Sequence, residues 1–310
     1  MLLHDMDDFG DLIAVTANEL TIDPGLVEKD YWIMHSLWGL QQLGMDFALK
    51  GGTSLSKGHG LIHRFSEDID ILIQPEFELP TKPNQNKPTH VEARRAFYDS
   101  LPKRLAIDGM NAERDRQFDD ERMRSAGIRL QYDALKALPE GVKTGILLEA
   151  GFDQVAPNRP CLISSWAYDH ARRSGIKGLT NNRAVDVLCY DPGFTLVEKL
   201  QTISTKFRKQ QETGAIPTNF MRHYYDVHCL LADDQVQGFI GSEAYHEHKK
   251  RRFRTADEPD FTRNEAFLLT DAVTRDLFEK AYLATRALYY REQPTLSVIM
   301  DRIAGHLHRL

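Results

Sequence analysis

FALKGGTSLSKGHGLIHRFSEDIDILI, residues 47–73, carries the clearest structural pattern in the chain. Its first residues, 47–49, form a short apolar run typical of a buried strand, and a lysine and two glycines follow. Residues 53–57 have the composition of the first turn of a helix. Residues 67–73 alternate acidic and apolar side chains with the period of a strand. The pattern therefore predicts two strands joined by a Gly-Gly turn and a helical segment.

Asp68 and Asp70 stand two apart in the second predicted strand. Residues with that spacing share one face of a strand, so the two carboxylates project together while Ile69 and Ile71 face a core. Carboxylates this close raise each other's pKa unless a cation lies between them. Magnesium takes hard oxygen ligands and bridges to substrate phosphates, so we predict that Asp68 and Asp70 bind Mg²⁺. The alternative is a surface strand with two solvated acids.

The Gly-Gly turn predicts a site for the phosphates of a nucleoside triphosphate (NTP). Two glycines let the backbone approach phosphate oxygens closely, and the start of a helix offers N–H donors. Hydroxyl groups and a lysine add further donors, although the P-loop pattern is absent, since no Gly-Lys-Ser/Thr follows at the required spacing. The predicted nucleotide-binding residues are Lys50, Gly51, Gly52, Thr53, Ser54 and Ser66.

Glu149 interrupts an apolar run at residues 145–152 that predicts another strand. A site that holds two metal ions takes a further carboxylate from a neighbouring strand. An acid within an apolar strand is costly unless a cation pairs with it, so Glu149 is the predicted third ligand and two Mg²⁺ ions are expected. Asp153 lies on the same face and is the competing candidate. A solvated or salt-bridged Glu149 is the alternative.

The chain as a whole predicts an α/β (α+β) fold, with a mixed sheet flanked by helices and a helical C-terminal half. Asp23 is a capping residue for the second of two leading helices, with Pro24 in its first turn. The first domain is expected over residues 1–190 and the helical domain over residues 191–310. The other expected elements are a loop at 75–90, a helix at 91–107, strands at 127–132, 145–152 and 186–190, and helices at 263–291 and 295–308.

Composition indicates an ordinary globular protein. The chain has 310 residues, of which 42% are hydrophobic and 27% charged, and its net charge is −6. No apolar run approaches the roughly 20 residues needed to cross a bilayer, and the N-terminus has no basic segment of a secretory signal. The three cysteines are far apart among apolar residues, which favours reduced thiols. We therefore expect a cytoplasmic protein that does not contact a membrane.

Lys249–Arg254 is the most basic segment of this acidic chain. It contains five cations, with Phe253 between the last two, in the order KKRRFR. Such a segment suits the phosphates of a nucleic acid, with the aromatic ring available to stack on a base. The alternative is a solvated helix face, because acidic residues flank the segment on both sides.

The motifs around the acid pair resemble those of the AbiEii/AbiGii toxin family of nucleotidyltransferases, within the DNA polymerase beta-like superfamily. Similarity extends beyond the motif region, in order along the chain from about residue 27 to 231. The segments that carry it are KGGTSL (residues 50–55), RFSEDID (64–70), VEKDYW (27–32), LVEKL (196–200) and RHYYDV (222–227).

The resemblance implies a nucleotidyltransferase fold and two further catalytic residues. Lys199 matches the helix lysine of the family and would offset triphosphate charge, and Asp226 matches its late aspartate. From the residues alone, Lys199 is as well explained by a lysine whose stem covers the apolar stripe of its helix. Asp226 stands four residues after Arg222, so an intrahelical ion pair is its alternative. His223 departs from the family pattern, which has an aspartate there.

The resemblance also implies a function. Relatives transfer a nucleotide from an NTP with magnesium, in some cases onto tRNA, as toxins of type IV toxin–antitoxin or abortive-infection systems. We therefore expect an enzyme that acts on an RNA hydroxyl, such as the 3′ end of tRNA, and a cognate antitoxin protein as partner. The alternatives are transfer to a protein or a small molecule, and a non-catalytic module that binds nucleotides or RNA.

Overall fold

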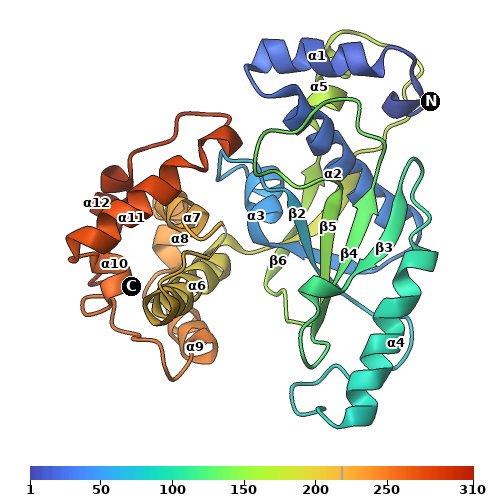
Figure 1. The fold of residues 1–310 in the computed structure, drawn as a ribbon. Helices are drawn as coiled ribbons and strands as arrows, with labels where there is room; N and C mark the ends of the chain where they lie inside the picture. Colours follow the sequence, from blue (N-terminus) through green and yellow to red (C-terminus); the bar gives the residue numbers. More distant parts are fainter. Residues whose placement is uncertain (218) are drawn as a thin grey trace. The chain divides into compact units, whose positions relative to one another are not determined.

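The computed structural model describes residues 1–217 and 219–310, and contacts divide the chain into two compact units. The first unit comprises residues 1–59 and 65–190 and contains all the strands (Figure 1). The second comprises residues 60–64 and 191–310 and is helical. The short segment 60–64 thus packs with the second unit although it lies between two elements of the first.

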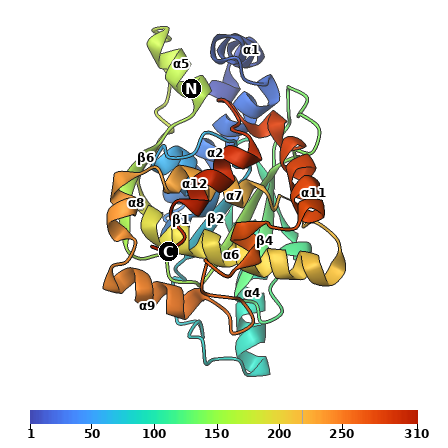
Figure 2. The ribbon, with the colours of Figure 1, turned by 90° about the vertical axis from the view of Figure 1, so that its left-hand side faces the viewer.

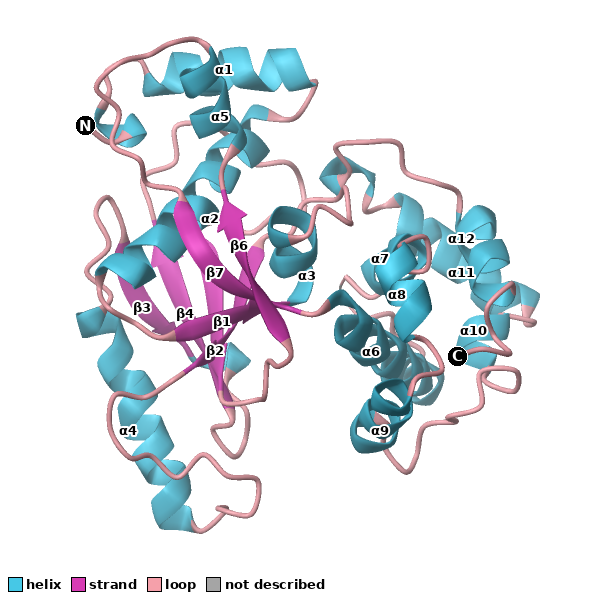
Figure 3. Cartoon of the chain, turned by 180° about the vertical axis from the view of Figure 1, so that it is seen from behind, coloured by secondary structure: helices cyan, strands magenta, loops and turns pink. Residues whose placement is uncertain are grey.

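The first unit is built on a seven-stranded mixed sheet in the order β3-β4-β5-β2-β1-β7-β6 (Figure 3). β2 runs antiparallel to β1 and parallel to β5, and β1 runs parallel to β7. The predicted mixed α/β class is confirmed. The strands are β1 (Phe47–Lys50), β2 (Asp68–Ile73), β3 (Asn111–Asp115), β4 (Ser125–Gln131), β5 (Ile146–Gly151), β6 (Asn158–Ile163) and β7 (Ala184–Tyr190).

The central pair β1 and β2 has the predicted strand–turn–helix–strand order. The helical connection begins at Gly51, two residues before the prediction, as a short α-helical turn α3 (Gly51–Thr53). It continues as a π-helical turn η2 (Ser54–Gly58). In β2, fully buried isoleucines alternate with half-buried residues, as the period of two requires.

Helix α2 (Pro24–Gln42) packs against β5 and β7, and α1 (Phe9–Leu20) and α5 (Trp166–Arg173) pack on α2 (Figure 1). As predicted, the Asp23 side chain caps α2, accepting a hydrogen bond from the Gly25 N–H at 2.8 Å. Every residue of α2 from 25 to 37 is buried, including three consecutive charged residues. The helix is therefore part of the core rather than an amphipathic surface helix.

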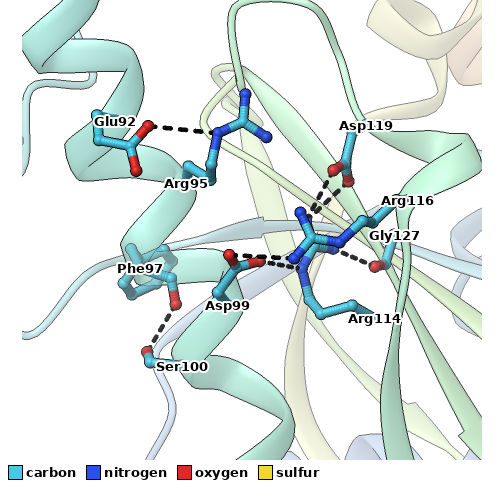
Figure 4. Close-up of polar contacts among 9 residues, drawn as sticks. All are labelled: Glu92, Arg95, Phe97, Asp99, Ser100, Arg114, Arg116, Asp119 and Gly127. Atoms are coloured by element: carbon cyan, nitrogen blue, oxygen red, sulfur yellow. Dashed lines mark hydrogen bonds and ion pairs between the residues drawn. The ribbon is translucent and has the colours of Figure 1, made fainter.

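Helix α4 (Pro88–Arg104) covers β3 and β4, and Arg114 of β3 fixes it there (Figure 4). The Arg114 guanidinium donates to Asp99 of α4 at 3.0 Å, to Asp119 at 2.8 Å and to the carbonyl of Gly127. These contacts fix α4 to β3 and β4 at one edge of the sheet, away from β2, which carries Asp68 and Asp70.

Two edge strands and one helix break were not predicted. The strands β3 and β6 are largely polar or exposed, and β6 contains Pro160, so neither shows the apolar alternation of an inner strand. The prediction of a single long helix at 263–291 is wrong. Leu269 takes a left-handed φ of 45° and Asp271 caps a new helix, which separates α10 (Glu265–Leu268) from α11 (Ala272–Leu283).

The second unit is organised around α6 (Pro192–Thr213), which contacts α7, α8, α9 and α10 (Figure 2). A bridge between Arg64 and Tyr289 holds the segment 60–64 to this unit. Over the described residues of both units, none of the helices is long and apolar enough to cross a membrane. The other helices of this unit are α7 (Arg222–Leu230), α8 (Asp234–Phe239), α9 (Glu243–Arg252), η4 (Arg286–Leu288) and α12 (Leu296–Ala304).

Candidate active site

Three carboxylates lie on one face of the sheet, on the adjacent strands β2 and β5. Asp68 and Asp70 are the half-buried residues that alternate with Ile69 and Ile71. Asp70 stands directly opposite Glu149 in the parallel register of β2 and β5, and Glu149 is the one position of β5 that is not fully buried. Paired positions in a sheet point to the same side, so the structure brings the three acids together.

Gly51 places the turn in contact with this acid cluster. Its φ of 73° lies in the left-handed region, and a Cβ atom on it would come within 2.0 Å of Oδ2 of Asp70. A side chain at this position would therefore clash with the carboxylate and strain the backbone. Only glycine permits this close approach of the turn to Asp70.

The acid cluster is electrostatically unbalanced. Burial, together with the neighbouring Asp70 and Asp68 and against a smaller opposing effect of Lys50, raises the pKa of Glu149 to about 8. A divalent cation among these oxygens would reverse the effect by favouring the ionised form of every carboxylate. Hard oxygen donors of this kind match the ligand preference of Mg²⁺, so the residues present fit such an ion.

The predicted phosphate-binding residues have different environments. Lys50, which ends β1, is half-buried and lies 4.0 Å from the carboxylate of Asp153. Asp153, the competitor for the third ligand, lies two residues beyond the end of β5 and is 45% exposed. Ser66 is half-buried in the loop that precedes β2.

The hydroxyl groups of Thr53 and Ser54 are buried within the unit. Thr53 Oγ1 donates to the carbonyl of Asp68 at 2.5 Å, and this hydrogen bond ties the turn to β2. Ser54 is completely buried next to the thiol of Cys189 on β7. Thr53 therefore stabilises the position of the turn, and in the structure it offers its hydroxyl to the backbone rather than to solvent.

Lys29 of α2 supports the residue that precedes the acid pair. Its ammonium lies 3.7 Å from Oε2 of Glu67 and donates to the carbonyl of Lys143 at 2.5 Å. Lys29 and Glu67 are both buried, and burial lowers the pKa of Lys29 to about 8. Glu67 also accepts the N–H of Lys143 at 3.2 Å. The start of β2 is thus held by a buried ion pair from α2.

Asp30, the next residue of α2, holds the other end of the turn. Its carboxylate lies 2.8 Å from the ammonium of Lys57, in the π-helical turn, and accepts the N–H of Trp166 at 2.8 Å. The Lys57 ammonium also lies 4.9 Å from the centre of the Trp166 ring. Two consecutive residues of one buried helix therefore clamp both sides of the segment that joins β1 to β2.

The positioning role of Lys29, Asp30, Lys57 and Glu67 was not predicted. A signal for it was present in the sequence, because three consecutive charges, Glu28 to Asp30, interrupt an apolar helix. Consecutive helical residues point about 100° apart, so the three cannot all face solvent from a helix that is otherwise apolar. Their partners are far away in the chain and could not be read from the local pattern.

Lys199 and Asp226 belong to the second unit, where they form a buried ion triad with Arg64. Both Nε and Nη2 of Arg64 donate to the Asp226 carboxylate at 2.7 Å, and the Lys199 ammonium lies 2.9 Å from it. Burial alone would raise the pKa of Asp226, but the two cations outweigh burial and hold it well below its ordinary value. Asp226 is therefore ionised, and the positive charges of Arg64 and Lys199 compensate its negative charge.

His223, at the position where the sequence departs from the family motif, is half-buried in the second unit. Burial lowers its pKa well below the ordinary value, and the neighbouring Lys199 and Lys206 lower it further. The neutral imidazole accepts a hydrogen bond from the Lys206 ammonium at 3.0 Å. An aspartate at position 223 would carry a negative charge, whereas the neutral His223 carries none.

A turn in contact with an acid-bearing strand, with a third acid on the next strand, is the arrangement predicted for a nucleotide and metal site, and it lies in a mixed α/β fold. The family described as "Nucleotidyl transferase AbiEii toxin, Type IV TA system" matches residues 32–302. The chain therefore belongs to the AbiEii nucleotidyltransferase toxin family of type IV toxin–antitoxin systems. The recognised resemblance is confirmed over most of the chain.

Among solved structures, an antigenic nucleotidyltransferase-like protein from Paracoccidioides brasiliensis is similar to the chain at 12% identity. The match covers 74% of this chain and 95% of that protein, with a TM-score of 0.31. This likeness is too weak to add to the family match. No curated protein matches the chain significantly.

Proposed function

We propose that the protein transfers a nucleoside monophosphate from an NTP to a hydroxyl group of RNA, with Mg²⁺ held by Asp68, Asp70 and Glu149. The observation that carries this proposal is the contact of Gly51 with Asp70, since it joins a backbone turn to the acid cluster. Bound Mg²⁺ would neutralise phosphate charge and lower the pKa of the attacking hydroxyl. The family of the chain supports both the reaction class and the type of donor.

Residues of the chain hold the substrate and the acids in place. The backbone of Gly51 and Gly52 is proposed to bind the triphosphate, together with Lys50, Ser54 and Ser66. The hydrogen bond of Thr53 to Asp68 keeps this turn in register with β2. Lys199 and Asp226 are proposed as further catalytic residues because they match motifs of the family, and within the second unit Asp226 positions the Lys199 ammonium.

RNA, and in particular the 3′ end of tRNA, is the proposed acceptor, and a cognate antitoxin is the proposed protein partner. Membership of a toxin family supports the antitoxin, and the cluster of cations on α9 supports a nucleic acid. Transfer to a protein or small molecule is the alternative within the same chemistry. A silent nucleotide-binding module is the alternative outside it.

The experiment incubates the protein with each α-labelled NTP, Mg²⁺ and total RNA, and follows both pyrophosphate release and the labelled product. We expect label to migrate with RNA and to disappear in the Asp68→Ala variant. Asp46→Ala is the matched control, since it removes an exposed carboxylate just before β1 of the same unit. It should retain full transfer.

The possible outcomes separate the proposals. Label on protein would replace the RNA acceptor with a protein acceptor. Nucleotide binding without pyrophosphate release would favour the silent module. Transfer that persists in Asp68→Ala would contradict the assignment of the metal site.

A further inference from the structure

A cavity of about 420 Å³ opens on the second unit along α9. Its volume is within the range of small-molecule sites, which begins at roughly 300 Å³. Lys249 and Lys250 lie three and four residues after His246, so these lining residues share one face of α9. The lining residues that matter here are His246, Lys249, Lys250, Phe253, Arg254 and Asp257.

The opposite face of α9 is attached to α6, which fixes the direction of this basic face (Figure 2). Arg252 forms an ion pair of 2.6 Å with Glu198 of α6. His248 is buried, and its ring centre lies 4.8 Å from that of Phe194. The helix therefore uses one side for packing and leaves the other side to the cavity.

The rim of the cavity carries uncompensated positive charge. Lys250 and Arg254 are exposed, and in residues 1–217 and 219–310 neither side chain forms an ion pair or hydrogen bond. Asp257 does not neutralise them, because Arg208 donates to its carboxylate at 3.1 Å and Thr205 at 2.5 Å. The nearby Glu258 accepts the N–H of Asp260 in the loop that follows. Two cations are thus available to an anionic ligand.

The wall of the cavity is aromatic and firmly held. The Phe253 ring is half-buried and meets the buried Phe261 ring edge to face, with centres 5.6 Å apart. Lys249 contacts this pair, with its ammonium 4.1 Å from the centre of the Phe261 ring. The same ammonium donates a hydrogen bond of 2.6 Å to the carbonyl of Leu310. Phe253 therefore presents a pre-ordered apolar surface beside the two free cations.

We propose that this cavity binds an unpaired nucleotide of single-stranded RNA, with its base against Phe253 and the flanking phosphates at Lys250 and Arg254. Aromatic stacking beside cations is the general mode of binding to single-stranded nucleic acid. An acidic peptide would use the cations but would have no need of an aromatic wall. The choice of RNA rests on the proposed function, since RNA is the proposed acceptor there.

The test measures binding of a short fluorescein-labelled single-stranded RNA by fluorescence anisotropy, without NTP, over a range of KCl concentrations. Lys250→Glu/Arg254→Glu should weaken binding at least roughly tenfold and flatten the slope of log affinity against log salt by about 1.4, the effect of two lost phosphate contacts. Phe253→Leu should weaken binding roughly tenfold and leave the slope unchanged, because it removes stacking but no charge.

Lys209→Glu/Lys280→Glu is the control, since it makes the same change of charge at exposed residues of α6 and α11. Binding that falls equally in the control, or that survives in the Lys250→Glu/Arg254→Glu protein, would overturn the inference. Displacement of RNA by polyglutamate at an equal concentration of charges would also overturn it, in favour of an acidic peptide.

Pyrophosphate release from NTP in the same proteins separates this inference from the proposed function. Asp46→Ala, which removes an exposed carboxylate outside both proposed sites, should bind the RNA as tightly as the unmodified protein. If the unmodified protein releases no pyrophosphate but loses RNA with the α9 changes, the cavity stands and the proposed reaction fails. If it transfers nucleotides while the α9 changes leave RNA binding intact, the cavity assignment fails.

Discussion

Glu149 in the first unit is half-buried and Asp226 in the second is fully buried, and their surroundings shift their pKa values in opposite directions. Burial, reinforced by the neighbouring Asp70 and Asp68, raises the pKa of Glu149 to about 8. Asp226 contacts Arg64 and Lys199, and its pKa falls well below its ordinary value. Two cations in direct contact with Asp226 stabilise its ionised form within the fold, whereas the like-charged neighbours of Glu149 disfavour its ionised form and are the basis of the proposed metal site.

The largest expected effect is on the second unit. Asp226→Ala leaves Arg64 and Lys199 buried without their counter-charge, so we expect a loss of about 3–5 kcal/mol in the free energy of unfolding. Urea denaturation followed by circular dichroism measures it. The comparison is with Asp70→Ala, which removes one member of a like-charged cluster and should change stability by less than about 1 kcal/mol. Equal losses in both proteins would remove the distinction between the two regions.

The buried ion pair of the first unit should give the next largest effect. Lys29→Met leaves Glu67 buried without the Lys29 ammonium and should lower the free energy of unfolding by about 3 kcal/mol. The loss is at the lower end of the usual range because the carboxylate still accepts the backbone N–H of Lys143. Lys29→Met/Glu67→Gln removes both charges and should recover most of that loss. Urea denaturation of the two proteins tests the claim, and a double variant no more stable than the single one would contradict it.

Gly51→Ala should have a smaller effect on stability and a large one on activity. The left-handed φ costs an alanine about 1–2 kcal/mol, and the added Cβ would displace the Asp70 carboxylate. We expect nucleotide transfer to fall severely while the protein remains folded. Gly44→Ala is the matched control, since Gly44 has a φ of 69° but no atom within 4 Å of the added Cβ. Loss of transfer in that protein as well would show that backbone strain alone is responsible.

The smallest effects for a single step of the measurement are slopes of stability against pH in metal-free protein, at most about 1.4 kcal/mol per pH unit for each group. The folded state lowers the pKa of Asp226, so its contribution is complete above the ordinary value of 3.8 and is lost as the pH falls below it. The folded state raises the pKa of Glu149, so stability falls as the pH rises from the ordinary value of 4.5 to about 8.

Each slope has its own variant. Asp226→Asn should flatten the acid limb, and Glu149→Gln should flatten the decline between pH 4.5 and 8. Thermal melting from below pH 3.8 up to about pH 8 measures both. Saturating Mg²⁺ should also remove the decline due to Glu149, because the bound ion keeps the carboxylate ionised in the folded state. An unchanged decline in Glu149→Gln would place its origin elsewhere.

Local patterns predicted the centre of the sheet well and its edges poorly. The alternation in Asp68–Ile73 and the apolar runs of β4, β5 and β7 predicted strands close to the observed bounds. Edge strands β3 and β6 bury too little to show such a pattern. The break at Leu269 escaped prediction because the apolar spacing continues through it, and only the backbone conformation and the Asp271 cap divide the helix.

By itself the sequence determined the strand–Gly-Gly–helix–strand unit and the common face of Asp68 and Asp70, because both depend on residues that are neighbours in the chain. Only the tertiary structure decided that Glu149 stands opposite Asp70, that Lys29 and Asp30 clamp the turn, and that Arg64 and Lys199 neutralise Asp226. Those pairings join segments far apart in sequence, and a charge has no partner until the fold brings one within a few ångströms.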